Sequence, residues 1–251
     1  MNNHHPYQSF RLRESFQGNS ATKILIFDHP LKAAQPGQFV MVWLPEVGEK
    51  PFSILNDAPF SLAVTSIGPL SSALHHLSVG GRIWVRGPFG RGFELDGHRH
   101  LLVGGGYGAA PLYFLARQAR SQDDEVQVYL GARSKDGVLL ADDFKRIGCQ
   151  VAITTEDGSQ GERGLVTLAV KSVLRSYHAD ALYSCGPVGM LSALMLICRE
   201  EKVAAQLSWE ANMRCGIGLC GSCELEQDVR SAAGIPSGWL TCKDGPVFFH
   251  P

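Results

Sequence analysis

Four cysteines near the C-terminus constrain this chain more than any other feature of its sequence. Cys215, Cys220 and Cys223 lie within the glycine-rich segment MRCGIGLCGSC, and Cys242 follows after a stretch of 18 residues. The spacing C-x4-C-x2-C with a distant fourth cysteine is the plant-type [2Fe–2S] pattern. Glycine tolerates positive φ and carries no Cβ, so a glycine-rich loop can turn tightly around two irons. We therefore predict an iron–sulfur cluster on a C-terminal tail.

Two alternatives fit these cysteines less well. A tetrahedral zinc site more often uses two short C-x2-4-C pairs, and this tail contains only one. Free buried cysteines are common singly, whereas here three occur within nine residues. The seven cysteines form an odd set, with Cys149, Cys185 and Cys198 scattered, which argues against a disulfide framework. Clustered thiols more often bind metal where they stay reduced, so we expect a cytoplasmic protein.

The bulk composition excludes several classes of protein. A chain of 251 residues with 45% hydrophobic and 19% charged residues has enough apolar side chains for two folded domains. A net charge of -1 gives no reason to expect nucleic acid or an anionic membrane as a partner. The opening stretch MNNHHPYQSF lacks the pattern of a signal peptide. The uncharged, glycine-rich stretch of residues 101–116 is too short to cross a bilayer.

The hydrophobic pattern changes twice along the chain. Residues 7–97 contain short apolar runs separated by Pro/Gly turns, which predicts a small antiparallel β-barrel. From residue 98, apolar strands alternate with amphipathic helices, which predicts a doubly wound parallel sheet. The last part has little periodicity. The predicted fold class is β-barrel plus α/β, with domains over residues 1–97, 98–205 and 206–251.

Two predicted strands of the α/β domain end in glycine-containing turns. The segment LLVGGGYGAAP places Gly104, Gly106 and Ala109 in a G-x-G-x-x-A arrangement between a strand and a helix. That context suits a nucleotide pyrophosphate at a helix N-terminus, although a tight turn alone would use the same residues. The second strand end, YSCGP, contains Cys185. Ligands collect at the carboxyl ends of such strands, so the two turns predict one crevice.

Two segments of the barrel offer groups that suit a phosphorylated aromatic ligand. In EKPFSIL, Lys50 is placed to neutralise a phosphate, Phe52 to lie against a ring and Ser53 to hydrogen-bond a ring nitrogen. The alternative is an ordinary strand entry. In IGPLSSALHHL, Ser71 and Ser72 stand near the start of a helix, where hydroxyls favour an anion or simply cap the helix.

Taken in order, the motifs KPFS, GPLSSAL, GPFGRGF, VGGGYGAAPL, TEDGSQGERGLVT, SCGP and the cysteine tail resemble one family. It is the electron transfer subunit of type B dihydroorotate dehydrogenase, within the ferredoxin–NADP reductase superfamily, and the resemblance runs from about Tyr7 to Phe249. It implies FAD on the barrel, NAD in the α/β crevice and a [2Fe–2S] cluster on the tail. It also implies a separate FMN-containing catalytic subunit, in a heterotetramer, where dihydroorotate becomes orotate.

The resemblance assigns functional residues by motif. Ser53 would tune the flavin ring and Cys185 would line the nicotinamide approach, without general acid or base chemistry. The cluster ligands would be Cys215, Cys220, Cys223 and Cys242. The flavin side would comprise Lys50, Pro51, Phe52, Ser53, Ala63, Val64, Thr65, Leu70 and Ser71, and the nicotinamide side Gly104, Gly105, Gly106, Gly108, Cys185, Gly186 and Pro187.

The chain departs from the family pattern in three places, which keeps other functions open. Lys50 replaces an arginine, so this position cannot make the two parallel hydrogen bonds that a guanidinium makes to a phosphate. Leu70 and Ser71 replace a Gly-Thr pair, and the last cysteine spacer is longer than expected. One alternative is a related reductase subunit of a ferredoxin:NADP reductase, sulfide dehydrogenase or hydrogenase complex. Another is a redox-sensing or scaffold protein without enzymatic activity. Arg133 and Ser134 leave the choice between NAD and NADP open.

Overall fold

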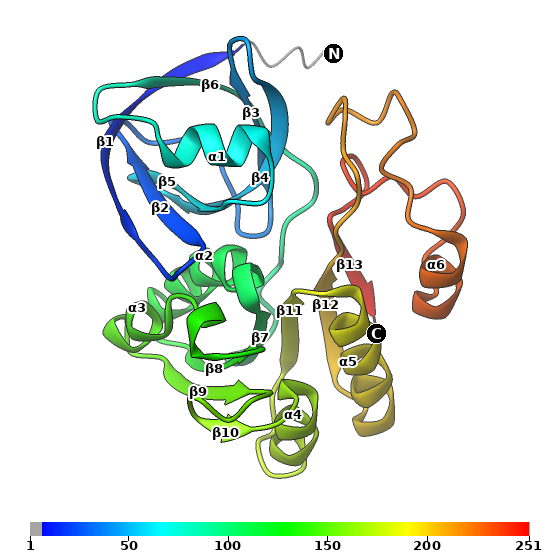
Figure 1. Ribbon diagram of the computed structural model, residues 1–251. Coiled ribbons are helices and arrows are strands. Elements are labelled where there is room, and N and C mark those ends of the chain that lie inside the picture. The colour runs from blue at the N-terminus through cyan, green and yellow to red at the C-terminus, as the bar shows by residue number, and fades with distance from the viewer. Residues whose placement is uncertain (1–6, 251) are drawn as a thin grey trace.

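A closed antiparallel barrel forms the N-terminal part of the protein. The computed structural model describes residues 7–250. Residues 1–6 and residue 251 lie outside it, and so does most of the opening stretch on which the expectation about a signal peptide rests. The barrel order is β1-β2-β5-β4-β3-β6 (Figure 1). Alternate residues of each strand point inward, as the pleat requires, and fill the barrel with aliphatic and aromatic side chains. The strands are β1 (Gln8–Gln17), β2 (Thr22–Phe27), β3 (Phe39–Leu44), β4 (Gly48–Asp57), β5 (Phe60–Thr65) and β6 (Arg82–Phe89), with helix α1 (Pro69–His75) between β5 and β6.

A seven-stranded sheet of order β10-β9-β8-β7-β11-β12-β13 follows the barrel. Its strands pair in parallel except for β13, which is antiparallel to β12. The strands are β7 (Arg99–Gly105), β8 (Glu125–Ala132), β9 (Gln150–Thr155), β10 (Glu162–Arg163), β11 (Ala181–Cys185), β12 (Ala204–Ser208) and β13 (Val247–His250). The predicted fold class is thereby confirmed.

Helices cover both faces of this sheet, as Figure 1 shows. On one face, α2 (Ala109–Arg120) and α3 (Ala141–Arg146) bury a core that includes Leu112, Leu115 and Phe144. On the other, α4 (Val166–Leu174) and α5 (Val188–Glu201) bury a core that includes Val170 and Leu194. Helix α2 also abuts the barrel, where Arg117 donates a hydrogen bond to Asn56 of β4. Within residues 7–250, none of the helices combines the length and hydropathy that a bilayer crossing requires.

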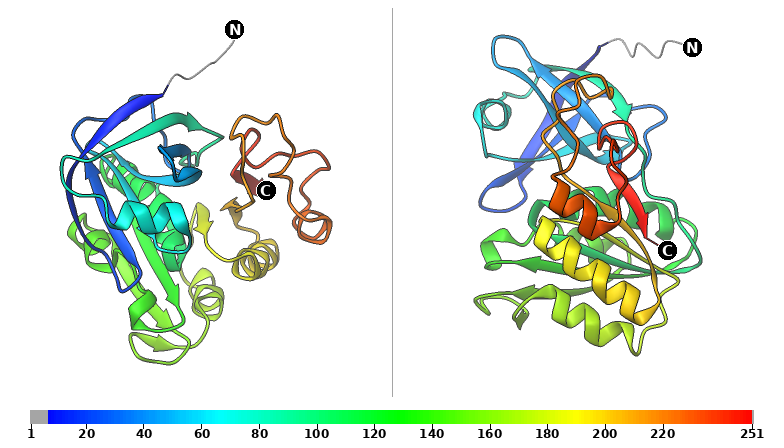
Figure 2. Two further views of the ribbon diagram at one scale, coloured as in Figure 1. Left: turned by 45° about the horizontal axis from the view of Figure 1, so that its top comes forward. Right: turned by 90° about the vertical axis from the view of Figure 1, so that its right-hand side faces the viewer.

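The cysteine tail leaves the sheet and returns to it. It departs at the end of β12, forms the cluster loop and the short helix α6 (Gln227–Ala233), and rejoins the sheet as β13. Figure 2 shows the tail beside the barrel and above α5. The sequence pattern did not predict β12 or β13 as strands. The boundary expected between residues 205 and 206 falls inside β12, so the tail and the α/β domain share one sheet.

A buried carboxylate joins β7 to β8 at the amino ends of these strands, opposite the glycine turns. Asp124 is 3% exposed and accepts hydrogen bonds from His98 Nδ1 at 2.7 Å and His100 Nε2 at 3.1 Å. Burial opposes the charge of Asp124, but the hydrogen bonds from the two histidines outweigh it and lower its pKa below the usual 3.8. The hydrogen bond to Asp124 raises the pKa of His98 above the usual 6.5.

We predict that Asp124→Asn lowers the thermal unfolding midpoint by about 2–4 °C, with a pH dependence set by these two groups. The lowered pKa of Asp124 contributes stability above the unfolded-state value of 3.8 that is lost as the pH falls further. The raised pKa of His98 contributes stability below 6.5 that is lost as the pH rises. Calorimetry at pH 5 and pH 8 should therefore find the larger difference at pH 5. Asp142→Asn, an exposed carboxylate, is the control, and an equal difference at both pH values would contradict the prediction.

Candidate functional site

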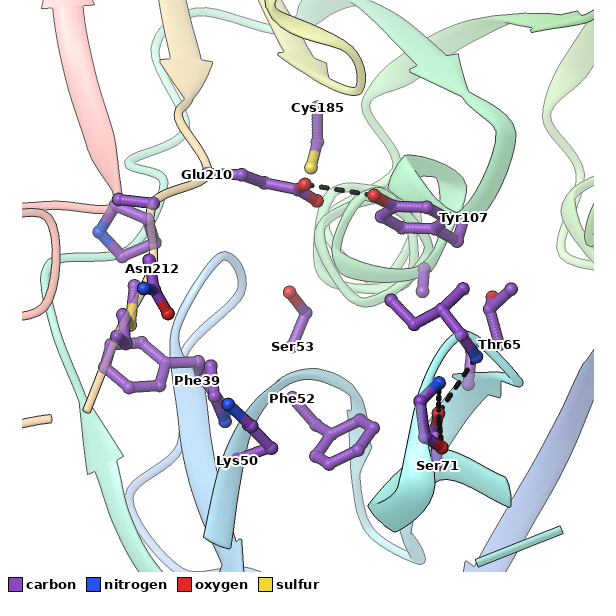
Figure 3. Close-up of a pocket in the computed structure, with 18 of the residues that line it drawn as sticks. Phe39, Lys50, Phe52, Ser53, Thr65, Ser71, Tyr107, Cys185, Glu210 and Asn212 are labelled. Carbon is purple, nitrogen blue, oxygen red and sulfur yellow. Dashed lines mark hydrogen bonds between the residues drawn. The ribbon is translucent and has the colours of Figure 1, made fainter. Parts of the chain in front are cut away.

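A cavity of about 550 Å³ lies where the barrel, the parallel sheet and the tail meet. This volume is in the range of small-molecule and cofactor sites. Its lining includes residues of β3, β4, β5, α1, the turn after β7, the end of β11 and the segment after β12. Figure 3 shows the barrel residues on one side and Cys185, Tyr107 and Glu210 on the other. Residues far apart in the sequence therefore form one site.

Strand β4 carries the predicted flavin motif along the cavity wall. Lys50, Pro51, Phe52 and Ser53 all belong to the lining. In Figure 3, Ser53 points toward the middle of the cavity, and Lys50 and Phe52 lie beside it on the barrel side. The strand holds this position because it pairs with β3 in register, with Ser53 opposite Phe39. The motif thus presents a cation, a ring and a hydroxyl to one space, which fits a flavin nucleotide.

The neighbouring strand and helix contribute unequally to the cavity. Ala63 and Thr65 of β5 line it, whereas Val64 is fully buried in the barrel core because adjacent strand residues face opposite ways. Val64 is therefore not part of the cavity lining. Leu70 and Ser71 line the cavity near the start of α1. The Ser71 hydroxyl accepts the N–H groups of residues 67 and 68 at 3.0 Å each, so it already shapes that turn.

The glycine turn and the SCGP segment meet behind the cavity. Strands β7 and β11 pair with Cys185 opposite Gly104. A Cβ at Gly108 would lie 2.1 Å from the carbonyl oxygen of Cys185, so only glycine permits this approach. The cavity lining includes Cys185. The other residues predicted for the nicotinamide side are not part of that lining: Gly104, Gly105, Gly106, Gly108, Gly186 and Pro187.

A hydrogen bond joins the turn after β7 to the segment after β12, on the side of the cavity opposite the barrel. Tyr107 Oη donates to Glu210 Oε2 at 3.0 Å (Figure 3). Burial, and then the charge of Glu210, raise the pKa of Tyr107 to about 12, so the phenol keeps its proton. Burial raises the pKa of Glu210 as well, although its carboxylate faces the open cavity. Burial, followed by the charge of Glu210, raises the pKa of Cys185 to about 12, and its thiol stays neutral.

The tail brings the four predicted cluster cysteines into one loop region. Cys223 Sγ and Cys242 Sγ lie 3.2 Å apart. Backbone N–H groups point at sulfur, from Gly218 to Cys242 at 3.1 Å and from Leu219 to Cys215 at 3.4 Å. Within residues 7–250, no three His, Cys, Asp or Glu side chains are arranged to hold a single metal ion. Four thiols with N–H donors aimed at sulfur match the donor set of an iron–sulfur cluster.

The pKa values of the tail cysteines differ with their exposure to solvent. The hydrogen bond from Ser222 lowers the pKa of the exposed Cys220 thiol to about 6. Burial raises the pKa of Cys242 to about 12. Coordination to iron would deprotonate a thiol outright. The cluster region therefore has one thiol open to solvent and two, Cys223 and Cys242, that are buried.

Sequence reasoning missed most of the tail side of the cavity and part of its barrel side. On the barrel side the missed residues are Phe39, Ile67, Gly68 and Pro69. Elsewhere they are Tyr107, Ala110, Pro246 and the run that starts at the last residue of β12: Ser208, Trp209, Glu210, Ala211, Asn212 and Met213. The run lies at the carboxyl end of β12, a five-residue strand of sequence AAQLS in the same parallel sheet. Recognising β12 as a strand would have placed the run at the crevice.

Two sequence-family models match the chain in the regions just described. The iron–sulfur cluster binding domain of dihydroorotate dehydrogenase B matches residues 210–250. An oxidoreductase NAD-binding domain matches residues 102–195. The first covers all four cysteines of the tail, and the second covers the glycine turn and Cys185.

Curated relatives match almost the whole chain. A probable dihydroorotate dehydrogenase B (NAD(+)) electron transfer subunit of Thermococcus kodakarensis is 38% identical over 242 residues, which cover 96% of each chain. The corresponding protein of Methanocaldococcus jannaschii is 37% identical over 239 residues, covering 95% of this chain and 88% of the relative. This chain belongs to the family of dihydroorotate dehydrogenase B electron transfer subunits.

Solved structures agree with this family. The structure of an NADH-dependent reduced ferredoxin-NADP oxidoreductase, studied for flavin-based electron bifurcation, superposes with a TM-score of 0.82 at 30% identity, covering 96% of this chain and 87% of that one. A ferredoxin reductase of carbazole 1,9a-dioxygenase shares the fold, with a TM-score of 0.68 at 19% identity over 79% of this chain and 66% of that one. The matched domains confirm the cluster-binding tail and the NAD-binding domain, and the likeness to a flavin-dependent reductase supports FAD on the barrel.

We predict that Lys50→Arg tightens FAD binding about fivefold, because a guanidinium can make two parallel charge-assisted bonds to a phosphate where an ammonium acts as a point charge. The measurement is a fluorescence titration of flavin-free protein with FAD. Lys32→Arg, an exposed lysine outside the cavity, is the control. Unchanged or weaker binding would mean that Lys50 does not face a phosphate.

Proposed function

We propose that this protein passes electrons between an FMN-containing dihydroorotate dehydrogenase catalytic subunit and NAD, in a heterotetramer of the two subunits. Dihydroorotate would be oxidised to orotate on the partner. One observation carries the proposal: the flavin-type strand, the strand end that holds Cys185 and the segment leading to the cluster cysteines all border a single cavity. Its curated relatives are named as electron transfer subunits, which implies a separate catalytic subunit.

Bound FAD would supply the exchange between two-electron hydride transfer and the one-electron transfer that an iron–sulfur cluster performs. The protein side chains have positioning roles. Ser53 points to the middle of the cavity and is placed to hydrogen-bond the flavin ring. Cys185 lines the same space with a neutral thiol, which suits a nicotinamide approaching the flavin. Lys50 offers its charge to a phosphate.

The cavity and the cluster region share a wall, which supports short-range electron transfer between them. Phe39 and Met213 line the cavity. The same two side chains pack with Met41, Cys223 and Cys242 in one buried cluster. A flavin held in the cavity would therefore lie one layer of side chains away from the cluster ligands.

The outer side of the cluster loop is open for a partner. Cys220 is exposed, and two aliphatic side chains beside it, Ile217 and Leu219, are 49% and 81% exposed. Exposed aliphatic residues around a redox centre favour a protein surface as the electron-transfer partner. We infer that the catalytic subunit docks here. Free thiols at such a position also favour the reducing cytoplasm as the site of action.

A second partner class is kept as an alternative because of one neighbour. The protein that superposes at 30% identity is a ferredoxin-NADP oxidoreductase, so the same fold serves other complexes. The curated relatives favour dihydroorotate dehydrogenase. Mass spectrometry of the complex purified from the native host tests the choice directly. Recovery of a hydrogenase or ferredoxin-dependent subunit in place of an FMN dehydrogenase would overturn the proposed partner.

We predict that anaerobically purified protein contains about two irons and two acid-labile sulfides per chain and releases FAD on boiling. Metal and sulfide analysis, with chromatography of the released flavin, makes the measurement. Zinc without labile sulfide would contradict the cluster assignment. FMN alone would contradict FAD, and a colourless protein would favour the scaffold alternative.

We predict that Cys220→Ser separates reduction of the flavin by NADH from electron transfer between the cluster and the partner subunit. A serine oxygen is a harder ligand than a thiolate, so the cluster should be impaired while the barrel and sheet keep their cores. Stopped-flow reduction of the flavin by NADH should persist, and partner-linked orotate formation should fall at least about 10-fold. Cys149→Ser, a cysteine outside the tail, is the control. Partner-linked turnover at the wild-type rate in a variant that lacks iron would refute this role of the cluster.

A further inference from the structure

The side chain of Arg86 on β6 joins the predicted flavin strand to the first cysteine of the tail. Its Nε and Nη2 donate to Oε1 and Oε2 of Glu49 on β4 at 2.8 and 2.7 Å. The same Nη2 donates to the carbonyl oxygen of Cys215 at 3.2 Å. Glu49 directly precedes Lys50, the first residue of the flavin motif. One guanidinium therefore contacts both the flavin strand and a cluster ligand.

The surroundings of this guanidinium hold it in one orientation. The side chains of Arg86 and Glu49 are only 18% and 20% exposed. Tyr7 donates a further hydrogen bond to Glu49 Oε1 at 2.8 Å. The guanidinium also lies 5.5 and 5.8 Å from the ring centroids of Tyr7 and Phe89. A bidentate pair between aromatic rings is far more restricted than an exposed ion pair.

The tail residue after Cys215 is fixed against the barrel as well. Gly216 has φ of +73°, and a Cβ there would lie 2.8 Å from Met41 Cγ and 3.1 Å from its sulfur. Met41 belongs to β3, the strand that lies between β4 and β6 in the barrel. Two consecutive residues of the cluster loop are thus held by two barrel side chains, Arg86 through a hydrogen bond and Met41 through packing.

We propose that Arg86, oriented by Glu49, is a positioning residue that fixes Cys215 against the flavin strand and, through its positive charge beside this ligand, raises the reduction potential of the cluster. This inference rests on the proposed cofactor set but not on the identity of the partner. Reduction adds one negative charge to a [2Fe–2S] cluster, and nearby charges and hydrogen bonds set its potential. Arg86 favours the reduced state, and Glu49 offsets part of that effect.

The test uses four variants of the full chain loaded with FAD and cluster. Arg86→Gln removes the positive charge and the fork, and Glu49→Gln leaves the positive charge without its counterion. Arg86→Lys keeps the charge but loses the bidentate geometry. Arg82→Gln is the matched control, since Arg82 lies on the same strand and is exposed, with its side chain bonded to Ser9. Each protein is characterised by iron content, the electron paramagnetic resonance spectrum of the reduced cluster, its potential by redox titration, and hydrogen exchange of residues 213–223.

The proposal requires potential shifts of opposite sign. Arg86→Gln should lower the cluster potential and Glu49→Gln should raise it, whereas Arg86→Lys and Arg82→Gln should leave it near the wild-type value. Hydrogen exchange of residues 213–223 should accelerate about tenfold in Arg86→Gln, because a hydrogen bond from a charged donor to the Cys215 carbonyl is lost. NADH-driven cluster reduction should slow roughly 10-fold in the same variant.

Shifts of the same sign in Arg86→Gln and Glu49→Gln, or no shift in either, would overturn the proposal and leave Arg86 a structural ion pair of the barrel. If Arg86→Gln fails to retain its cluster, the comparison of Glu49→Gln with Arg86→Lys still tests the proposal. A cluster potential raised in Glu49→Gln alone supports it. The same cluster potential in both variants refutes it. These measurements use no dihydroorotate and no second subunit. A wrong partner assignment would therefore leave their outcome unchanged.

Discussion

The packing of strand β3 against the tail determines the geometry of both candidate cofactor sites. Phe39 at the start of this strand lines the cavity, and together with Met41 it contacts Met213, Cys223 and Cys242. Near the end of the barrel, a Cβ at Gly90 would lie 2.4 Å from the carbonyl oxygen of Gly245. Protein interiors are close-packed and transmit small displacements. A movement of the tail on the barrel would therefore change the cavity and the cluster loop together.

The fold could be predicted from the sequence wherever the signal is local. Strand β8 and helix α5 have the bounds that their apolar patterns indicate, because alternation and helical periodicity are properties of a short segment. Strands β12 and β13 were missed for the opposite reason. They have five and four residues and pair with each other across the whole tail. Pairing over such a distance leaves no periodic signature in either segment.

The same distinction separates the parts of the site. The predicted cluster cysteines stand out because three of them occupy one short loop with their glycines, so the spacing itself indicates the chemistry. The flavin strand could be proposed only through resemblance, since KPFS alone is an ordinary strand entry. Tyr107 and Glu210 could not be paired from the sequence, because they are 103 residues apart and meet only through the sheet. Val64 could be assigned to a strand that contacts the flavin. Whether its side chain faces the cavity or the barrel core depends on the strand register, which only the folded barrel defines.

The shifted pKa values of the cavity groups leave Cys185 and Tyr107 uncharged. Burial raises the pKa values of the Cys185 thiol and the Tyr107 phenol to about 12, so both groups stay protonated well above neutral pH. Glu210 is the lining group whose pKa moves toward neutrality, and one of its oxygens is already engaged by Tyr107. General acid–base catalysis needs a group poised near the working pH and in reach of substrate. With Cys185 and Tyr107 held neutral, the cavity walls offer shape, apolar surface and the fixed charge of Lys50. These are the contributions that a protein makes when bound cofactors carry the reaction.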